Sequence, residues 1–240
     1  MKKIISYSLW GNNLYYTVNC IKNTELAKDL FPDWTCRIYF APTVPIAILD
    51  ELSSRDNTEL VAMPTDESWN GMFWRFLPAA DSTVDVMISR DADSLLNIRD
   101  KAAVDEWLSS DKDFHIMRDN SAHSTEILGG MWGARNRILL SMKDLIDRYT
   151  RKETNNRHNI DQEFLAEIVY PQVINRALVH DPLRRYGHGK EFPIPRKRPW
   201  FEDTLNAIHK DCEWIGDDND YIGKPAVFGD CHFNDYHKKF

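Results

Sequence analysis

The sequence of 240 residues lacks the marks of a secreted, membrane-spanning or metal-cluster protein. It has four cysteines, Cys20, Cys36, Cys212 and Cys231, and no two of them are spaced as a CxxC metal or redox motif. Because they form no disulfide framework, we expect a reducing compartment and a cytoplasmic protein. No apolar run approaches the ~18 residues that a membrane span needs. The short apolar run after Met1 is broken too early for a signal peptide.

Positive charge is also scarce. Lys and Arg total 30 against 37 Asp and Glu, which gives a formal net charge of −7. Nucleic-acid binding depends on clustered positive charge, so this balance excludes a nucleic-acid polymer as the expected partner. The sequence has neither a GxGxxG dinucleotide motif nor a Walker A loop. Hydrophobic content of 42% and aromatic content of 12% nevertheless predict a folded protein with a sizeable core.

Predicted strands and helices alternate along the chain. Apolar runs predict strands at 4–9, 35–41, 59–63, 84–89, 114–117, 127–134 and 176–179. Helical periodicity predicts helices at 15–30, 45–53, 68–80, 100–108, 137–149 and 161–169. This alternation predicts an α/β protein with a mostly parallel central sheet flanked by helices on both faces. Ligands bind beyond the carboxyl ends of the strands in such sheets, so the ends of the first, fourth and fifth strands are the places to examine.

The last quarter of the chain differs in composition from the rest. From Pro182 onward it is rich in Pro, Gly and basic residues, which predicts loops and short elements and not a second domain. We therefore expect residues 1–240 to form one domain, with 182–240 as a tail wrapped over the core. Because Arg184, Arg185 and the run 196–198 are basic, we hypothesise that the tail closes over a bound anionic ligand as a lid.

The most informative motif is a pair of aspartates directly after the fourth predicted strand. Asp91 and Asp93 flank the small residue Ala92. Two carboxylates at positions i and i+2 of an extended segment lie near each other and repel, whereas together they suit a hard divalent cation that takes oxygen ligands. Their place at the carboxyl end of a strand favours a metal and ligand site over an ordinary Asp-rich turn.

Four motifs, in this order, resemble those of the GT-A glycosyltransferases. Arg75 lies 91 − 75 = 16 residues before Asp91, where several GT-A families carry a basic residue. The segment 84–94 is similar to their strand and DxD motif, and 127–134 (ILGGMWGA) resembles their Gly-rich segment. Asp161, followed by a glutamine, resembles the start of their DQ helix. The resemblance covers about residues 4 to 181, is closest to small bacterial or large-virus enzymes, and implies a single Rossmann-like GT-A domain.

This resemblance implies a metal-dependent transferase that moves a sugar from a UDP- or GDP-linked donor to a hydroxyl of a glycan or other acceptor. Asp91 and Asp93 would hold Mn²⁺ or Mg²⁺, and that cation would neutralise the diphosphate leaving group. Arg75 and Asp161 are the expected catalytic residues. The expected donor-binding residues are Ser8, Leu9, Trp10, Gly11, Arg75, Asp91, Ala92, Asp93, Gly129 and Gly130. Trp132 is an expected neighbour of the pocket, as are Trp10 and Trp74.

The family pattern also supplies a third metal ligand, a histidine from late in the chain. The available residues are His180, His188, His232 and His237. We prefer His180, because it follows the apolar run 177–179 at a predicted strand end. His123 and His158 lie in loops near the expected site, where either would instead touch substrate.

Two other function classes remain open. A nucleotidyltransferase that makes sugar nucleotides also binds at the end of a first strand, but residues 9–13 lack the Lys or Arg of its usual phosphate loop. A non-catalytic carbohydrate- or nucleotide-binding module is disfavoured by the intact carboxylate pair. The stereochemical outcome is open as well, since an inverting enzyme would take its general base from Asp119, Glu126 or Asp161. The length of 240 residues leaves no room for the two Rossmann domains of a GT-B enzyme.

Overall fold

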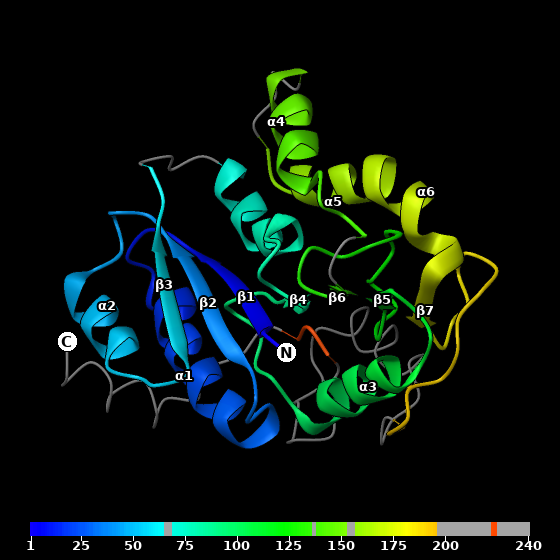
Figure 1. Ribbon diagram of the computed structural model, residues 1–240, viewed down its shortest axis with the longest axis horizontal. Helices are drawn as coiled ribbons and strands as arrows, with labels where there is room; N and C mark the ends of the chain where they lie inside the picture. Colours follow the sequence, from blue (N-terminus) through cyan, green and yellow to red (C-terminus); the bar gives the residue numbers. More distant parts are fainter. Residues whose placement is uncertain (65–68, 136–137, 153–156, 196–221, 225–240) are drawn as a thin grey trace, which may run out of the picture.

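A computed structural model describes residues 1–64, 69–135, 138–152, 157–195 and 222–224. Within these ranges the chain folds around one sheet of seven strands, in the order β3–β2–β1–β4–β6–β5–β7 (Figure 1). The strands are β1 (Lys3–Leu9), β2 (Thr35–Phe40), β3 (Thr58–Ala62), β4 (Val86–Ser89), β5 (Phe114–Met117), β6 (Trp132–Arg135) and β7 (Ala177–His180). The α/β class and the mostly parallel sheet are therefore confirmed.

One strand departs from the expected direction. β6 runs antiparallel to both of its neighbours, with Ser89 of β4 opposite Trp132 and Phe114 of β5 opposite Ala134, whereas the other paired strands are parallel. β6 is also shorter than the predicted strand at 127–134. The segment between β5 and β6 has no crossover helix, and a strand that returns without such a crossover pairs antiparallel to the one before it.

The helical elements follow the predicted positions with two differences in type. They are α1 (Leu14–Leu30), α2 (Ile46–Ser53), η1 (Trp69–Ala80), α3 (Ile98–Ser109), α4 (Met142–Lys152), α5 (Ile160–Phe164), η2 (Leu165–Val169), α6 (Tyr170–Val173) and η3 (Ile174–Arg176). The predicted helix at 68–80 is the 3₁₀ helix η1, which contains Pro78. The predicted helix at 161–169 is α-helical only in α5 and continues as the π-helix η2. The predicted helix at 137–149 begins later, at Met142.

Hydrophobic side chains cover the sheet on both faces. Ile5 and its neighbours on one face pack against α1, α2 and α3, and Trp107 of α3 is fully buried there. On the other face, Ile4 belongs to a second cluster that includes Phe73 of η1 and Phe164 of α5. Figure 1 shows these two helical layers on opposite sides of the strands. Side chains alternate between the faces of a strand, so neighbouring residues of β1 serve different cores.

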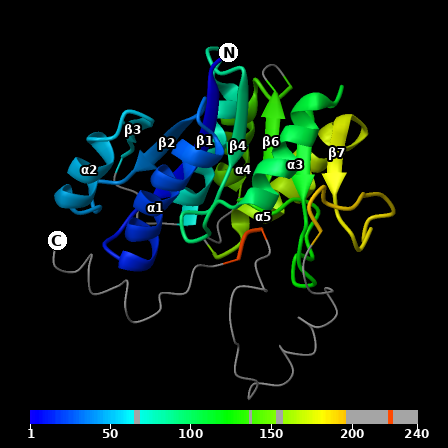
Figure 2. The same cartoon turned by 90° about the horizontal axis from the view of Figure 1, so that it is seen from below.

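Within the described ranges, no helix combines the length and apolar character needed to cross a bilayer. Cys20 and Cys36 are buried and carry free thiols. Most of the predicted tail, including the run 196–198, lies outside the described residues. So do Cys212, Cys231, His232 and His237. The described parts of the tail are 182–195 and the short segment 222–224 (orange in Figure 2).

Candidate functional site

A cavity of about 470 Å³ opens at the carboxyl ends of β1 and β4. Most of the predicted site residues line it, namely Ser8, Leu9, Trp10, Gly11, Arg75, Asp91, Ala92, Asp93 and Asp161. Because β2 and β4 flank β1 on its two sides, the strand order reverses here. In open α/β sheets this reversal leaves a crevice beyond the strand ends, which is where ligands bind.

Arg75 connects the two carboxylates that the sequence places far apart. Its Nη1 lies 2.7 Å from Oδ1 of Asp91, and its Nη2 donates to Oδ2 of Asp161 at 2.7 Å. Its backbone N–H donates to the hydroxyl of Ser8 at 3.0 Å, which fixes η1 to the end of β1. Burial disfavours the charged guanidinium, but the negative charges of Asp91, Asp161 and Asp93 outweigh it and raise the pKa of Arg75.

The carboxylates of the site differ in how fully the protein satisfies them. Burial and the nearby charge of Asp91 raise the pKa of Asp93 to about 6. Burial also raises the pKa of Asp161, against the lowering effect of Arg75. Oδ1 of Asp161 is buried and has no hydrogen-bond partner among the described residues. A buried oxygen without a partner is costly, which makes this atom a ready acceptor for a ligand hydroxyl.

Gly129 and Gly130 stand behind this charged cluster and are not on the cavity wall. A Cβ on Gly129 would lie 2.2 Å from Nη2 of Arg75 and 2.5 Å from Oδ2 of Asp161. A Cβ on Gly130 would lie 2.1 Å from Oδ2 of Asp91. These distances give both glycines a packing role, and their contact with a donor stays a prediction. Their missing side chains leave the space that the ion pairs occupy.

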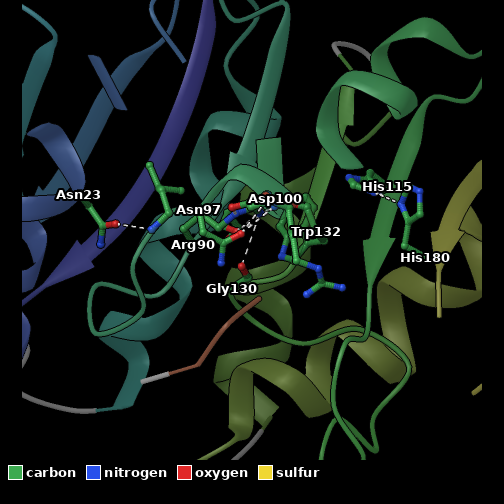
Figure 3. A network of polar contacts seen from close by, with 11 residues as sticks. Asn23, Arg90, Asn97, Asp100, His115, Gly130, Trp132 and His180 are labelled. Atoms are coloured by element: carbon green, nitrogen blue, oxygen red, sulfur yellow. Dashed lines mark hydrogen bonds and ion pairs between the residues drawn. The ribbon is translucent and has the colours of Figure 1, made fainter. Parts of the chain in front are cut away.

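The structure does not bring His180 to the aspartate pair. Its Nδ1 is hydrogen bonded to His115 at 2.8 Å and its Nε2 to Glu106 at 2.9 Å, and the residue has no exposed surface. Figure 3 shows His180 and His115 apart from Gly130, whose backbone abuts Asp91. The two strands β6 and β5 separate β7 from β4. The preferred third metal ligand is thus a structural histidine, because both of its ring nitrogens already have partners.

Of the other candidate third ligands, only His188 lies within the described residues. His188 is hydrogen bonded to the hydroxyl of Tyr170 at 3.1 Å. No group of three metal-ligating side chains is present in the part of the chain that the structure describes. Of the three candidate general bases, only Asp161 lines the cavity, whereas Asp119 is paired with Arg99 and Glu126 lies elsewhere. Arg184 and Arg185, two basic residues of the predicted lid, do not line it either.

His158, which was expected to touch substrate, lines the cavity together with further residues, some of which were not predicted as site residues. Trp69 and His158 meet edge to face, with ring centroids 5.2 Å apart, on the cavity wall. Tyr16 also lines the cavity. Its pKa is raised mainly by burial and also by the negative charges of Asp93 and Asp91. The other additions are Asn12, Asn13, Met72, Ser94, Asn159, Gln162 and Gly223. Most of them lie near a predicted strand or helix end, whereas Met72 is inside a predicted helix and Gly223 has no such signal.

Two of the three tryptophans expected near the pocket are in core positions. Trp132 has no exposed surface and stacks on Phe114 at 5.3 Å, so it does not reach the cavity. Trp74 is buried and packs edge to face against Trp10, with centroids 6.2 Å apart. Trp10 itself lines the cavity. Aromatic content alone therefore did not separate core residues from site residues.

Comparison with known proteins relies on structure alone. No sequence family matches this chain, and no curated protein matches it. A glycosyltransferase involved in the glycosylation of the major capsid of PBCV-1 aligns at a TM-score of 0.51 and 18% identity, over 76% of this chain and 82% of that chain. The galactosyltransferase LgtC aligns at 0.51 and 9% identity, over 75% and 73%.

A third structure, residues 1–349 of TarS from S. aureus, aligns at a TM-score of 0.50 and 12% identity, over 80% of this chain and 59% of that chain. Nucleotidyltransferases also match, at the lower TM-scores of 0.45 and 0.47. Identities this low show the fold alone. The sheet order, the two helical layers and the three glycosyltransferase alignments agree, and the chain has the GT-A fold.

Proposed function

We propose that this protein is a divalent-metal-dependent glycosyltransferase that moves a sugar from a UDP- or GDP-linked donor to a hydroxyl of a glycan or other acceptor. The observation that carries the proposal is the convergence of Asp91, Asp93, Arg75 and Asp161 on one cavity at the strand reversal of a GT-A fold. The four residues come from three separate parts of the sequence, and Arg75 links two of them directly.

The proposed nucleotide position is the end of β1. Gly11 has a positive φ of 71°, and its N–H donates to Thr43 at 2.9 Å, so the loop after β1 is fixed in place. Tyr16 leaves 42% of its surface exposed at the cavity, although it is a large aromatic residue. An exposed aromatic ring beside main-chain donors and acceptors supports stacking and edge recognition of a planar base.

The donor set at β4 supports Mg²⁺ or Mn²⁺. Mg²⁺ in proteins is commonly held by one or two carboxylates together with substrate phosphates and water, and not by an all-protein cage. Asp91 and Asp93 fit this pattern. Burial, followed by the charge of Asp91, raises the pKa of Asp93 to about 6, and a bound cation would offset this penalty on the charged carboxylate. When bound, the metal would neutralise charge on the departing diphosphate. His180 is not among the proposed ligands, because both of its ring nitrogens have partners.

In the proposed mechanism Arg75 and Asp161 supply charged groups that are held in fixed positions. The guanidinium is buried and held by two carboxylates, so its charge is preorganised beside the aspartate pair. The unpartnered Oδ1 of Asp161 supports an acceptor role toward a sugar hydroxyl. Trp69 and His158 provide an aromatic surface on the same cavity, which supports contact with the face of a sugar ring. In this arrangement the chain mainly orients the reactants and stabilises charge.

The proposal is tested by titrating UDP and GDP into the protein with MnCl₂, and by assaying release of the nucleoside diphosphate from a panel of sugar nucleotides. We expect Asp93→Asn and Asp91→Asn to lower metal-dependent nucleotide affinity and turnover by at least about 100-fold, because the cation loses a charged ligand. Asp105→Asn is the matched control, since Asp105 is a surface residue of α3 that pairs with Lys101. Full affinity and turnover in both site variants would rule out the proposed role.

The same assays separate the other two function classes. A nucleotidyltransferase would release pyrophosphate from a nucleoside triphosphate and a sugar phosphate, and would leave sugar nucleotides intact. A binding module would bind the nucleotide or a sugar with no turnover of either. Release of nucleoside diphosphate only in the presence of a divalent cation supports the glycosyltransferase.

A further inference from the structure

A short segment late in the chain reaches the proposed active site. Gly223 lines the same cavity as the aspartate pair, although it lies 223 − 93 = 130 residues after Asp93. Ile222 is only 2% exposed and packs in a small apolar cluster with Met131 and Phe192. The segment 222–224 is orange in Figure 2. It is therefore a fixed part of the cavity wall, placed by contacts with distant parts of the chain.

The backbone of this segment fits tightly against the core. Gly223 has a φ of 81°, a backbone conformation that residues with a side chain rarely adopt. A Cβ at this position would also lie 2.8 Å from the sulfur of Met131. The backbone at Gly223 thus lies between Met131 on one side and the cavity on the other. A shift of the segment would change the shape of the cavity.

One buried ion pair holds the segment in place. Asp119, after β5, is bonded through both carboxylate oxygens to the guanidinium of Arg99 in α3. Oδ2 of Asp119 also accepts the backbone N–H of Ile222 at 2.9 Å. The Asp119 side chain has no exposed surface and that of Arg99 is 9% exposed. A hydrogen bond to a buried charge is stronger than one between neutral groups, so this contact fixes the backbone of Ile222.

The same ion pair also holds the chain near Phe192 and Ile194, at the end of the first described segment of the tail. Nε of Arg99 donates to the carbonyl of Ile194 at 3.0 Å, and the Arg99 guanidinium lies 5.0 Å from the ring centre of Phe192. The contact with Ile194 spans 95 residues of sequence, and the contact between Asp119 and Ile222 spans 103. Arg99 and Asp119 thus join two tail segments to the end of β5 at one point. Neither residue of the pair lines the cavity.

We propose that the Arg99–Asp119 pair is a positioning element, which sets Gly223 as a wall of the ligand cavity by holding the backbone at Ile194 and Ile222. The inference rests on the proposed function for the identity of the ligand, a nucleoside diphosphate. It goes beyond that function because Arg99 and Asp119 do not line the cavity and would act on it through the backbone that they hold.

The test compares Asp119→Asn with wild type in two measurements. Hydrogen exchange of peptides containing 222–224 reports on the segment without any ligand, and titration with UDP or GDP and MnCl₂ reports on the cavity. We expect Asp119→Asn to speed exchange of these peptides and to weaken nucleotide binding by about tenfold, a usual effect of losing a hydrogen bond to a charged group. Gly223→Ala is expected to weaken binding similarly while leaving the Arg99–Asp119 pair intact.

Asp181→Asn is the matched control. Asp181 also forms an ion pair, with Arg118, in which both side chains are only 1% exposed, and it does not line the cavity. We expect this control to leave nucleotide affinity and exchange at 222–224 close to wild type. Unchanged exchange in Asp119→Asn would overturn the proposal, and so would equal losses of affinity in Asp119→Asn and Asp181→Asn. If wild type binds neither UDP nor GDP, the proposed function fails while the exchange measurement still decides the positioning role.

Discussion

The two halves of the sheet compensate the acidic residues beyond their strand ends to different degrees. After β4, Asp91 and Asp93 face a cavity, and Asp161 across from them keeps one oxygen without a partner among the described residues. After β5 and β7, Arg118 and Asp181 are buried and bonded to each other at 2.8 Å. Both halves place acids and arginines beyond the strands. They differ at Asp93, which has no ion-pair partner among the described residues, whereas Asp91 and Asp161 pair with Arg75 and Asp181 pairs with Arg118.

This difference shows where the fold needs a ligand. A buried charge that is paired and hydrogen bonded is already compensated, and removing one partner harms the fold. A carboxylate that is crowded by another carboxylate is compensated only when a cation or a donor group arrives. Asp93, whose pKa is raised to about 6, belongs to the second kind. The contrast therefore separates residues that hold the fold from residues held ready for binding.

We call the part of the sheet at β5 and β7, with Arg118 and Asp181, the closed half, and the part at β1 and β4, with the cavity, the open half. The sharpest test of this contrast removes one partner from the closed half. Arg118→Met leaves the buried carboxylate of Asp181 without its guanidinium, and we expect the free energy of unfolding to fall by about 3–5 kcal/mol. Urea denaturation measures this loss. The nucleotide affinity of the folded fraction should stay near wild type, because neither residue lines the cavity. A stability loss below about 1 kcal/mol would contradict the structural role.

The counterpart in the open half is Asp93→Asn. The folded state disfavours ionised Asp93, so its raised pKa means that stability is greatest below the ordinary pKa of about 4 and is lost as the pH rises through about 6. Removing the charge should therefore raise stability at pH 7 in metal-free protein, while nucleotide binding falls. A variant that loses both stability and binding would place Asp93 with the structural residues.

Another test of the open half fills the space that Gly129 and Gly130 leave beside the charged residues. Gly130→Ala introduces a Cβ 2.1 Å from the Asp91 carboxylate, and Gly129→Ala introduces one 2.2 Å from the Arg75 guanidinium. We expect either change to lower turnover about 100-fold, because small displacements of positioned groups have effects of that size. Gly187→Ala is the control for a strained glycine outside the site, since its φ of 77° disfavours a side chain but its Cβ would meet nothing within 4 Å. Near-normal turnover in both site variants would show that the cluster tolerates displacement.

The sequence predicted the elements well because hydrophobic periodicity carries most of the information that fixes them. β5 is predicted at its observed bounds, and the aspartate pair follows β4 as expected. Strand direction was less predictable: β6 is antiparallel because of the connection before it, and its own residues do not reveal that. The 3₁₀ geometry of η1 was likewise missed, although Pro78 lies in it.

The site was predictable where a residue follows a strand and less so where packing decides. His180 ends β7 much as Asp91 follows β4, yet Glu106 and His115 occupy both of its ring nitrogens. Neither partner is near it in sequence, so no local pattern distinguishes this histidine from a ligand. Gly223 was missed for a related reason, since distant contacts bring it to the cavity. Tertiary pairing therefore accounts for the main errors.

The smallest expected effect is a pH dependence that belongs to the closed half. Burial, followed by the charges of His180 and Arg90, lowers the pKa of His115 well below its ordinary value. Burial also lowers the pKa of His180, although Glu106 partly opposes it. In the unfolded chain these two histidines become protonated near pH 6.5, whereas in the folded protein they become protonated only at lower pH. Stability is complete above about pH 6.5 and is lost as the pH falls, by at most ~1.4 kcal/mol per pH unit for each histidine.

Urea midpoints at pH 7.5, 6.5 and 5.5 would measure this loss. His115→Phe removes one of the two titrating groups and keeps a ring to stack on Trp107, where the ring centroids are 5.3 Å apart in the native protein. We expect the variant to be less stable at pH 7.5, because His180 loses a hydrogen-bond partner, and to lose less stability on acidification than wild type. An equal or steeper loss in His115→Phe would show that the buried histidine pair does not set the acid sensitivity of this half.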